Sequence, residues 1–134
     1  LSHSSAASDV YKRQGHFYAY APKKYEYPIN RYAMEVKRQL DLLDKNLGER
    51  EYICGKEYNI ADIAIHSWYG TLVLNNAYNS SEFLEVDSYK NVVRWAKQIT
   101  ERPAFKRGSL VNRKPNGPDD NAILERHDAS DIKI

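Results

Sequence analysis

The sequence predicts an all-α helical bundle, because two long stretches carry apolar residues with helical spacing and no stretch has the pattern of a β-strand. Apolar residues recur every three or four positions across residues 28–47, as on one face of a helix. Residues 60–73 are apolar nearly throughout. Such a helix has to be covered on every side, so we expect it at the centre of the bundle. A chain of 134 residues suits one domain.

The first fourteen residues are mostly small and polar, and they show no periodicity. The string from Ser5 to Gln14 resembles the translated sequencing-adaptor sequence that contaminates assembled genomes; a natural disordered arm is the alternative interpretation. We therefore predict that residues 1–14 are a non-native or disordered segment, and we expect the natural protein to begin upstream.

The first predicted helix begins at Pro28, which suits the first helical position because a missing N–H costs nothing there. Gly48 follows the helix as a C′ residue that would end it. The apolar stripe between them consists of Ile29, Ala33, Val36, Leu40, Leu43 and Leu47.

The second predicted helix opens with Asn59 and Asp62, which are spaced as a capping box. The Asn59 side chain can accept a hydrogen bond from the first turn, and the Asp62 carboxylate can reach back to the Asn59 N–H. Tyr58 and Ile63 occupy the positions of a hydrophobic staple. The sequence therefore predicts a structural capping box at Asn59 and Asp62.

The rest of the chain predicts two shorter helices and a tail. Residues 75–88 read as a connection, in which Asp87 or Ser88 can cap the next helix. Proline opens a short helix over Pro103–Leu110, and residues 112–134 are rich in turn formers and predict a mostly extended tail. The buried face of the helix before Pro103 is predicted to consist of Val92, Val93, Trp95, Ala96 and Ile99.

Charge and cysteine content exclude several classes of function. The formal net charge of +2 is too small to indicate a nucleic-acid or membrane-surface partner, and no run approaches the ~20 apolar residues that span a bilayer. Cys54 is the single cysteine, so the chain has no internal disulfide, no CxxC pair and no cysteine cluster for zinc. A lone thiol fits a reducing compartment, and we expect the protein in the cytoplasm.

Three motifs resemble the C-terminal helical domain of glutathione transferases, where a capping box opens the central buried helix. They are Tyr52-Ile53-Cys54-Gly55, Tyr58-Asn59-Ile60-Ala61-Asp62-Ile63-Ala64 and Arg102-Pro103-Ala104. That family usually has Ser or Thr at the cap, and Asn59 can do the same work. The resemblance implies a helical domain over residues 15–111, followed by the tail.

Other motifs resemble the bacterial nu class of this family, the glutathione-dependent disulfide-bond reductases. They are Gly15-His16-Phe17, Ala21-Pro22, Tyr27-Pro28-Ile29-Asn30-Arg31-Tyr32 with Glu35 and Arg38, and Glu125-Arg126-His127-Asp128-Ala129-Ser130-Asp131. The family's thioredoxin-like domain, with its catalytic region, has no counterpart in this sequence, and neither does most of the first helix of the helical domain. No catalytic residue is therefore carried over to this chain.

The resemblance implies that the parent protein is a glutathione transferase or disulfide-bond oxidoreductase. It implies glutathione as cosubstrate, no metal, a disulfide or electrophilic small molecule as second substrate, and a homodimer in the full-length form. This part alone is predicted to be inactive and to supply one side of the glutathione and second-substrate pocket. The alternative is a non-catalytic protein-interaction module, because helical domains of this family also serve in assembly.

Arg31 is the candidate binding residue. It lies about 200° around the predicted helix from Ile29, and so points away from the apolar stripe. In the first turn, a cation beside free N–H groups makes a local anion site. The resemblance implies that an arginine in this motif contacts bound glutathione, which carries two carboxylates. Without the motif, Arg31 would be read as an ordinary surface arginine.

Two further residues invite a chemical interpretation that the sequence favours less than a structural one. Asp62 is expected to satisfy backbone donors, with a loss of about 1–2 kcal/mol in folding free energy on replacement by alanine. His66 stands four residues after Asp62, but no third ligand is spaced to complete a metal site, which favours a buried, hydrogen-bonded histidine.

An aromatic group precedes Arg31 and consists of His16, Tyr18, Tyr20, Tyr25 and Tyr27. The resemblance places this region beside the pocket for the second substrate. The same side chains could equally serve in packing, and the sequence leaves both interpretations open.

Overall fold

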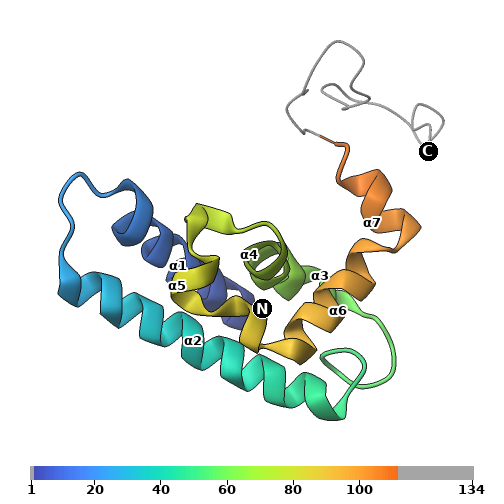
Figure 1. Cartoon of the computed structure of the whole chain (residues 1–134). Helices are drawn as coiled ribbons and strands as arrows, with labels where there is room; N and C mark the ends of the chain where they lie inside the picture. The colour runs from blue at the N-terminus through green and yellow to red at the C-terminus, as the bar shows by residue number, and fades with distance from the viewer. Residues whose placement is uncertain (1, 112–134) are drawn as a thin grey trace. The chain divides into compact units, whose positions relative to one another are not determined.

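The structure is a computed structural model that describes residues 2–111. In that range all named elements are helical, and no strand is formed; Tyr52 and Gly55 make an isolated β-bridge, which leaves the all-α prediction confirmed. The helices, with η for a 3-10 or π-helical turn, are α1 (Ser2–Gly15), η1 (His16–Tyr20), α2 (Glu26–Glu49), α3 (Ile60–Ile65), η2 (His66–Gly70), α4 (Thr71–Leu74), η3 (Ala77–Asn79), α5 (Ser81–Leu84), η4 (Val86–Ser88), α6 (Lys90–Thr100) and α7 (Pro103–Gly108) (Figure 1). The chain divides into two compact units, Leu1–Lys97 and Gln98–Ile134.

The long helix α2 carries the core stripe that the sequence predicts. It begins at Glu26 with Tyr25 as its N-cap residue, so Pro28 is the third helical residue rather than the first. Proline is tolerated there because the first N–H groups of a helix have no partner within it. The buried residues of α2 are Ala33, Val36, Leu40, Leu43 and Leu47.

The end of α2 differs from the prediction, because the helix continues past Gly48 to the next residue. The Arg94 guanidinium donates to the carbonyls of Leu47 and Arg50 at 2.9 and 3.1 Å. These bonds satisfy carbonyls at the helix end, so no left-handed glycine is needed there. Gly48 instead leaves room for Asn91, whose Nδ2 would lie 3.2 Å from an added Cβ.

The apolar stretch that begins at Ile60 forms one helical run, α3–η2–α4, which lies inside the first unit (Figure 1). Its buried residues are Asp62, His66, Tyr69, Gly70, Leu72 and Val73. The prediction of burial on all sides is wrong at the start of the run, where Ile60 and Ile63 are 77% and 52% exposed. The first turns pack through the face that carries Asp62, so the opposite face meets solvent.

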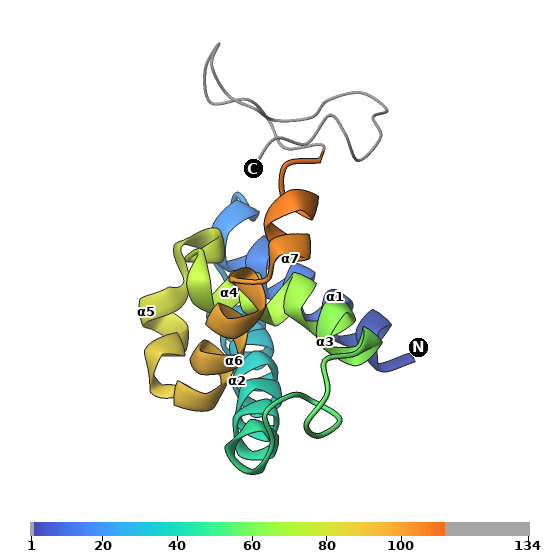
Figure 2. The same cartoon turned by 90° about the vertical axis from the view of Figure 1, so that its right-hand side faces the viewer.

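Residues 2–15 form helix α1, so the expectation of a disordered segment is wrong. The helix forms a hairpin with α2 and packs beside α3 (Figure 2). Tyr11 and Gln14 are buried on this side. Two inward residues in one short helix are too few to give a periodic signal in the sequence. The non-native origin of residues 1–14 stays a prediction.

The segment over residues 75–88, read from the sequence as a plain connection, contains η3, α5 and η4. Leu84 and Val86 are buried, so this segment contributes to the core. Four of its residues, none of them glycine, have a left-handed φ: Asn76, Tyr78, Asn79 and Glu85. Single turns of this kind carry no repeating apolar pattern, which explains why the sequence did not indicate them.

Helix α6 is capped from α2 and not by its own preceding residues. Asp44 Oδ1 accepts hydrogen bonds from the backbone N–H groups of Asn91 and Val92 at 2.8 and 3.1 Å. The cap therefore comes from Asp44 rather than from the predicted Asp87 or Ser88. A partner 47 residues away has no signal in the local sequence.

The second unit contains α7, which begins with proline at an early helical position, as predicted. The predicted tail over residues 112–134 lies outside the described residues. Among the described helices, none combines the length and the apolar character that a membrane crossing requires.

Candidate functional site

Asn59 and Asp62 form the predicted capping box at the start of α3. Asn59 Oδ1 accepts a hydrogen bond from the Ala61 N–H at 2.9 Å, and Asp62 Oδ2 accepts from the Asn59 N–H at 3.0 Å. Asp62 also does more than the sequence indicates. Its Oδ1 accepts from the Ile53 N–H at 3.0 Å and from Trp95 Nε1 at 2.8 Å. The Asp62 side chain thus connects the segment between α2 and α3 with the start of α3 and with α6, which is a structural role.

His66 is buried and hydrogen-bonded, as the sequence favours. Its Nε2 lies 3.2 Å from the Ala96 carbonyl oxygen, and its ring packs edge-on against Trp95. Burial lowers the pKa of His66, so the neutral ring is preferred. A neutral ring that donates from Nε2 keeps its acceptor lone pair on Nδ1. Within residues 2–111 no group of three metal-ligating side chains is present.

Arg31 is exposed on α2, as the helical period predicts. The prediction that it lies in the first turn beside free N–H groups is wrong, because α2 begins five residues before it. Among the described residues Arg31 has no hydrogen bond or ion pair, and only a weak electrostatic attraction to Glu35. Its guanidinium is therefore available to an external anion.

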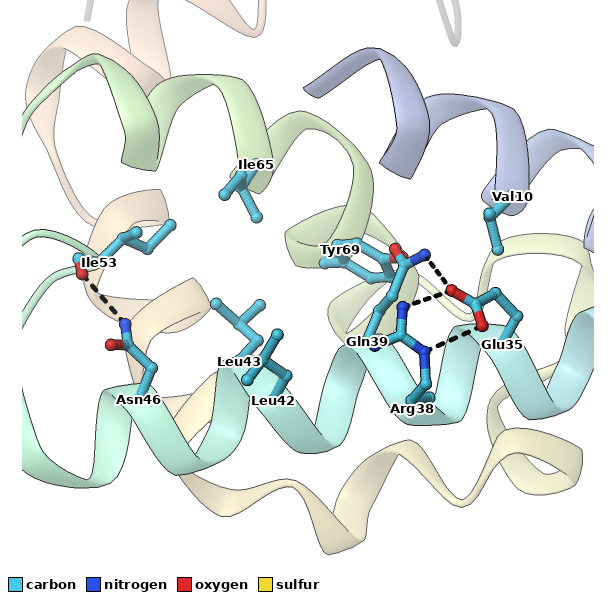
Figure 3. Close-up of a pocket in the computed structure, with 10 residues that line it drawn as sticks. All are labelled: Val10, Glu35, Arg38, Gln39, Leu42, Leu43, Asn46, Ile53, Ile65 and Tyr69. Atoms are coloured by element: carbon cyan, nitrogen blue, oxygen red, sulfur yellow. Dashed lines mark hydrogen bonds and ion pairs between the residues drawn. The ribbon is translucent and has the colours of Figure 1, made fainter. Parts of the chain in front are cut away.

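A polar network lies on the turns of α2 that follow Arg31 in the sequence, and Figure 3 shows its members Glu35, Arg38, Gln39 and Tyr69. Glu35 Oε1 accepts from Arg38 Nη2 at 2.6 Å and from Gln39 Nε2 at 2.9 Å, while Oε2 accepts from Arg38 Nε at 3.0 Å. These bonds hold the pKa of Glu35 near 2, well below its usual range. The Tyr69 hydroxyl donates to Gln39 Oε1 and so anchors the network to the buried η2.

This network forms the polar end of a cavity of about 600 Å³ between α1, α2 and the start of the central run (Figure 3). Asn46 lies at its other end, where Nδ2 donates to the Ile53 carbonyl at 3.0 Å. Burial raises the pKa of Tyr69, which therefore stays a neutral hydroxyl donor. The apolar walls consist of Val10, Leu42, Leu43, Ile53 and Ile65.

The aromatic residues before Arg31 serve partly in packing. Tyr18 stacks on Phe83 with ring centroids 4.8 Å apart, and Tyr20 packs edge-on against Tyr78. Tyr25 and Tyr27 are exposed and make no ring contact within the described residues. The sequence group is therefore divided between packing and surface.

A second, shallower depression lies on the same side of α2, beside Tyr32. Phe17 stacks on Tyr32 at 5.5 Å and meets His16 edge-on. The depression has a volume of about 440 Å³ and is lined by Lys12, Arg13, His16, Phe17 and Tyr32. Sequence reasoning missed Tyr32, although it stands next to Arg31.

Glu35 and Arg38 also received no role of their own from the sequence, which named them only within a motif. Their three-residue spacing on one helix is the signal that could have paired them. Cys54 is exposed in the turn of the β-bridge, and nothing on the described part of the chain assigns it chemistry.

The sequence profile "Glutathione S-transferase, C-terminal domain" matches residues 14–103. The chain is 56% identical over 119 residues to the disulfide-bond oxidoreductase YghU of Escherichia coli, covering 89% of this chain and 41% of that protein. It is 52% identical over 101 residues to a GST-like protein of Streptococcus mutans, covering 75% of this chain and 38% of that protein. The chain thus spans about two fifths of the length of these relatives.

Two solved structures agree with these matches. One is a glutathione transferase YghU from Streptococcus pneumoniae complexed with glutathione; it has a TM-score of 0.76 and 57% identity over 78% of this chain and 41% of that one. Another, from Burkholderia graminis, has two glutathione molecules bound per subunit, a TM-score of 0.71 and 34% identity, covering 83% of this chain and 45% of that one. By sequence and by fold, the chain belongs to the glutathione S-transferase family, and its residues 14–103 match the family's C-terminal domain.

Proposed function

We propose that this chain is the C-terminal part of a glutathione-dependent disulfide-bond oxidoreductase and supplies one wall of its glutathione site. Arg31 is the residue that binds a glutathione carboxylate. The observation that carries this proposal is the exposed guanidinium of Arg31, which has no ion-pair partner among the described residues. Arg31 directly precedes Tyr32, which lines a depression together with other aromatic and cationic side chains, and this combination suits an anionic peptide.

The reaction needs no thiol pair from this chain. Two glutathione thiols reduce one substrate disulfide: one thiolate attacks a substrate sulfur and releases the first substrate thiol, and a second attacks the resulting mixed disulfide. The products are glutathione disulfide and two substrate thiols, so glutathione supplies both electrons. Glutathione is the ligand named for the Streptococcus pneumoniae relative, which supports the same ligand here. These relatives do not favour the non-catalytic interaction module.

The test uses the full-length gene product, titrated with glutathione by calorimetry and assayed for reduction of bis(2-hydroxyethyl) disulfide. Arg31→Met should weaken glutathione binding by about tenfold or more, as expected for the loss of one charge-assisted hydrogen bond. Lys45→Met is the matched control, because it removes an exposed cation from the same helix, about 21 Å further along.

Equal affinity for glutathione in the Arg31→Met variant and the original protein would remove Arg31 from the site. An oxidoreductase activity of the 134-residue chain alone, comparable to that of the full-length protein, would contradict the assignment of a supporting role. We expect no turnover from this chain alone, and we expect the full-length enzyme to be a cytoplasmic homodimer.

A further inference from the structure

We infer that Arg38 is a positioning residue, which keeps Arg31 available to glutathione by occupying Glu35. This inference rests on the proposed function, since it concerns the same binding residue. Glu35 stands between two arginines on α2, four residues after Arg31 and three before Arg38. Either arginine is close enough in the helix to pair with its carboxylate.

In the structure the Glu35 carboxylate pairs with Arg38. Arg38 binds both Glu35 oxygens, through Nη2 at 2.6 Å and Nε at 3.0 Å, in the two-point geometry that is strongest for this pair. Gln39 adds a third donor to Oε1 at 2.9 Å. In Figure 3 the carboxylate points along the helix toward Arg38 and Gln39.

The order of the two residues along the helix also favours pairing of Glu35 with Arg38 over pairing with Arg31. A pair with glutamate on the N-terminal side and arginine on the C-terminal side is stronger than the reverse, so Glu35–Arg38 is the better arrangement and Arg31–Glu35 the weaker one. Gln39 is itself held by the hydroxyl of the buried Tyr69. The network from Tyr69 to Arg38 thus holds the Glu35 side chain in place, with 22% of it exposed.

Removing Arg38 should release Glu35 to its remaining cationic neighbour. The carboxylate would then attract Arg31 and form an ion pair between residues four apart, a spacing that permits contact. Glutathione would have to break that pair before it could bind. An exposed pair of this kind should weaken glutathione binding by roughly three- to fivefold.

The experiment compares three variants with the original full-length protein by calorimetric titration with glutathione. Arg38→Gln should bind glutathione three- to fivefold more weakly, and the double variant Glu35→Gln/Arg38→Gln should bind as well as the original protein. Rescue by the second substitution is the readout that a structural role would not give, because removing both partners leaves Arg31 without a competing anion. Lys45→Gln controls for the loss of one positive charge on α2.

A second measurement does not depend on glutathione. Arginine side-chain NMR reports the rotation of each guanidinium, which slows when it is paired. Arg31 should rotate freely in the original protein and in the double variant, and slowly in Arg38→Gln. If Arg31→Met leaves glutathione binding unchanged, the proposed function fails, while this NMR series still tests the pairing.

Two results would overturn the inference. One is an Arg38→Gln variant with the original affinity and a freely rotating Arg31. The other is weakened binding that Glu35→Gln fails to restore, which would mean that Arg38 itself binds the ligand or supports the fold.

Discussion

Asp62 and Glu35 are two carboxylates that each accept three hydrogen bonds, yet they lie in opposite surroundings. Asp62 is completely buried and is bound by two backbone N–H groups and the Trp95 indole. Glu35 lies at the surface of α2 and is bound by side chains alone. The first arrangement joins elements far apart in the sequence, whereas the second fixes the charge pattern of one helix. Three hydrogen bonds to the buried Asp62 carboxylate therefore stabilise the fold. Three hydrogen bonds to the Glu35 carboxylate at the surface, in our proposal, leave Arg31 available to bind glutathione.

The largest effect is expected from Asp62→Ala. The change leaves the Trp95 indole and the Ile53 and Asn59 N–H groups without their acceptor, and each buried orphan donor costs free energy. We expect a loss of about 3–5 kcal/mol in the free energy of unfolding. Urea unfolding measures it, with exposed Asp87→Ala as the control. A loss of only 1–2 kcal/mol, as an isolated helix cap would give, would contradict the joining role of Asp62.

Gln14 extends the comparison, because it is buried like Asp62 but lacks the hydrogen bonds that Asp62 has. It is 1% exposed, and neither its oxygen nor its nitrogen has a hydrogen-bond partner. Leucine has a similar volume to glutamine and has no polar group to bury. Gln14→Leu should therefore raise the free energy of unfolding by about 1–3 kcal/mol. Thermal melts against exposed Asn30→Leu measure the gain. An unchanged or lower melting temperature would mean that α1 does not sit on the bundle in this way.

Low pH should reduce the stability of the fold, because it favours protonation of the buried His66. Burial lowers its pKa below the ordinary 6.5, so the unfolded chain binds a proton before the folded one as the pH falls. The contribution of His66 to stability is complete above pH 6.5 and decreases below it, by at most about 1.4 kcal/mol per pH unit. His66→Gln should remove this part of the slope, and exposed His16→Gln should leave it. Identical slopes in all three proteins would show that His66 titrates normally in the folded state.

The smallest effect is expected from Glu35→Gln on stability. Its three bonds match those of Asp62 in number, but surface ion pairs contribute little because water screens them and long side chains lose entropy. We expect the free energy of unfolding to change by less than about 1 kcal/mol. A loss as large as that of Asp62→Ala, measured by the same urea unfolding, would break the distinction between the two carboxylates.

The sequence predicts the hydrogen bonds of these side chains only where the two partners are close in the sequence. Asn59 and Asp62 are three residues apart, so their capping box can be read from the chain, but Trp95 is 33 residues from Asp62 and leaves no local trace. The helical period places Arg31 outside the core. It does not mark where α2 begins, because the N-cap residue Tyr25 and the first helical residue Glu26 are both exposed and do not extend the apolar stripe.

The crystal structure of the full-length protein with glutathione tests the central claim most directly. It should place the Arg31 guanidinium within about 3 Å of a glutathione carboxylate, with Glu35 still bound to Arg38. A complex in which glutathione occupies its site while Arg31 pairs with Glu35, or faces solvent away from the ligand, would contradict the role given to this side of α2.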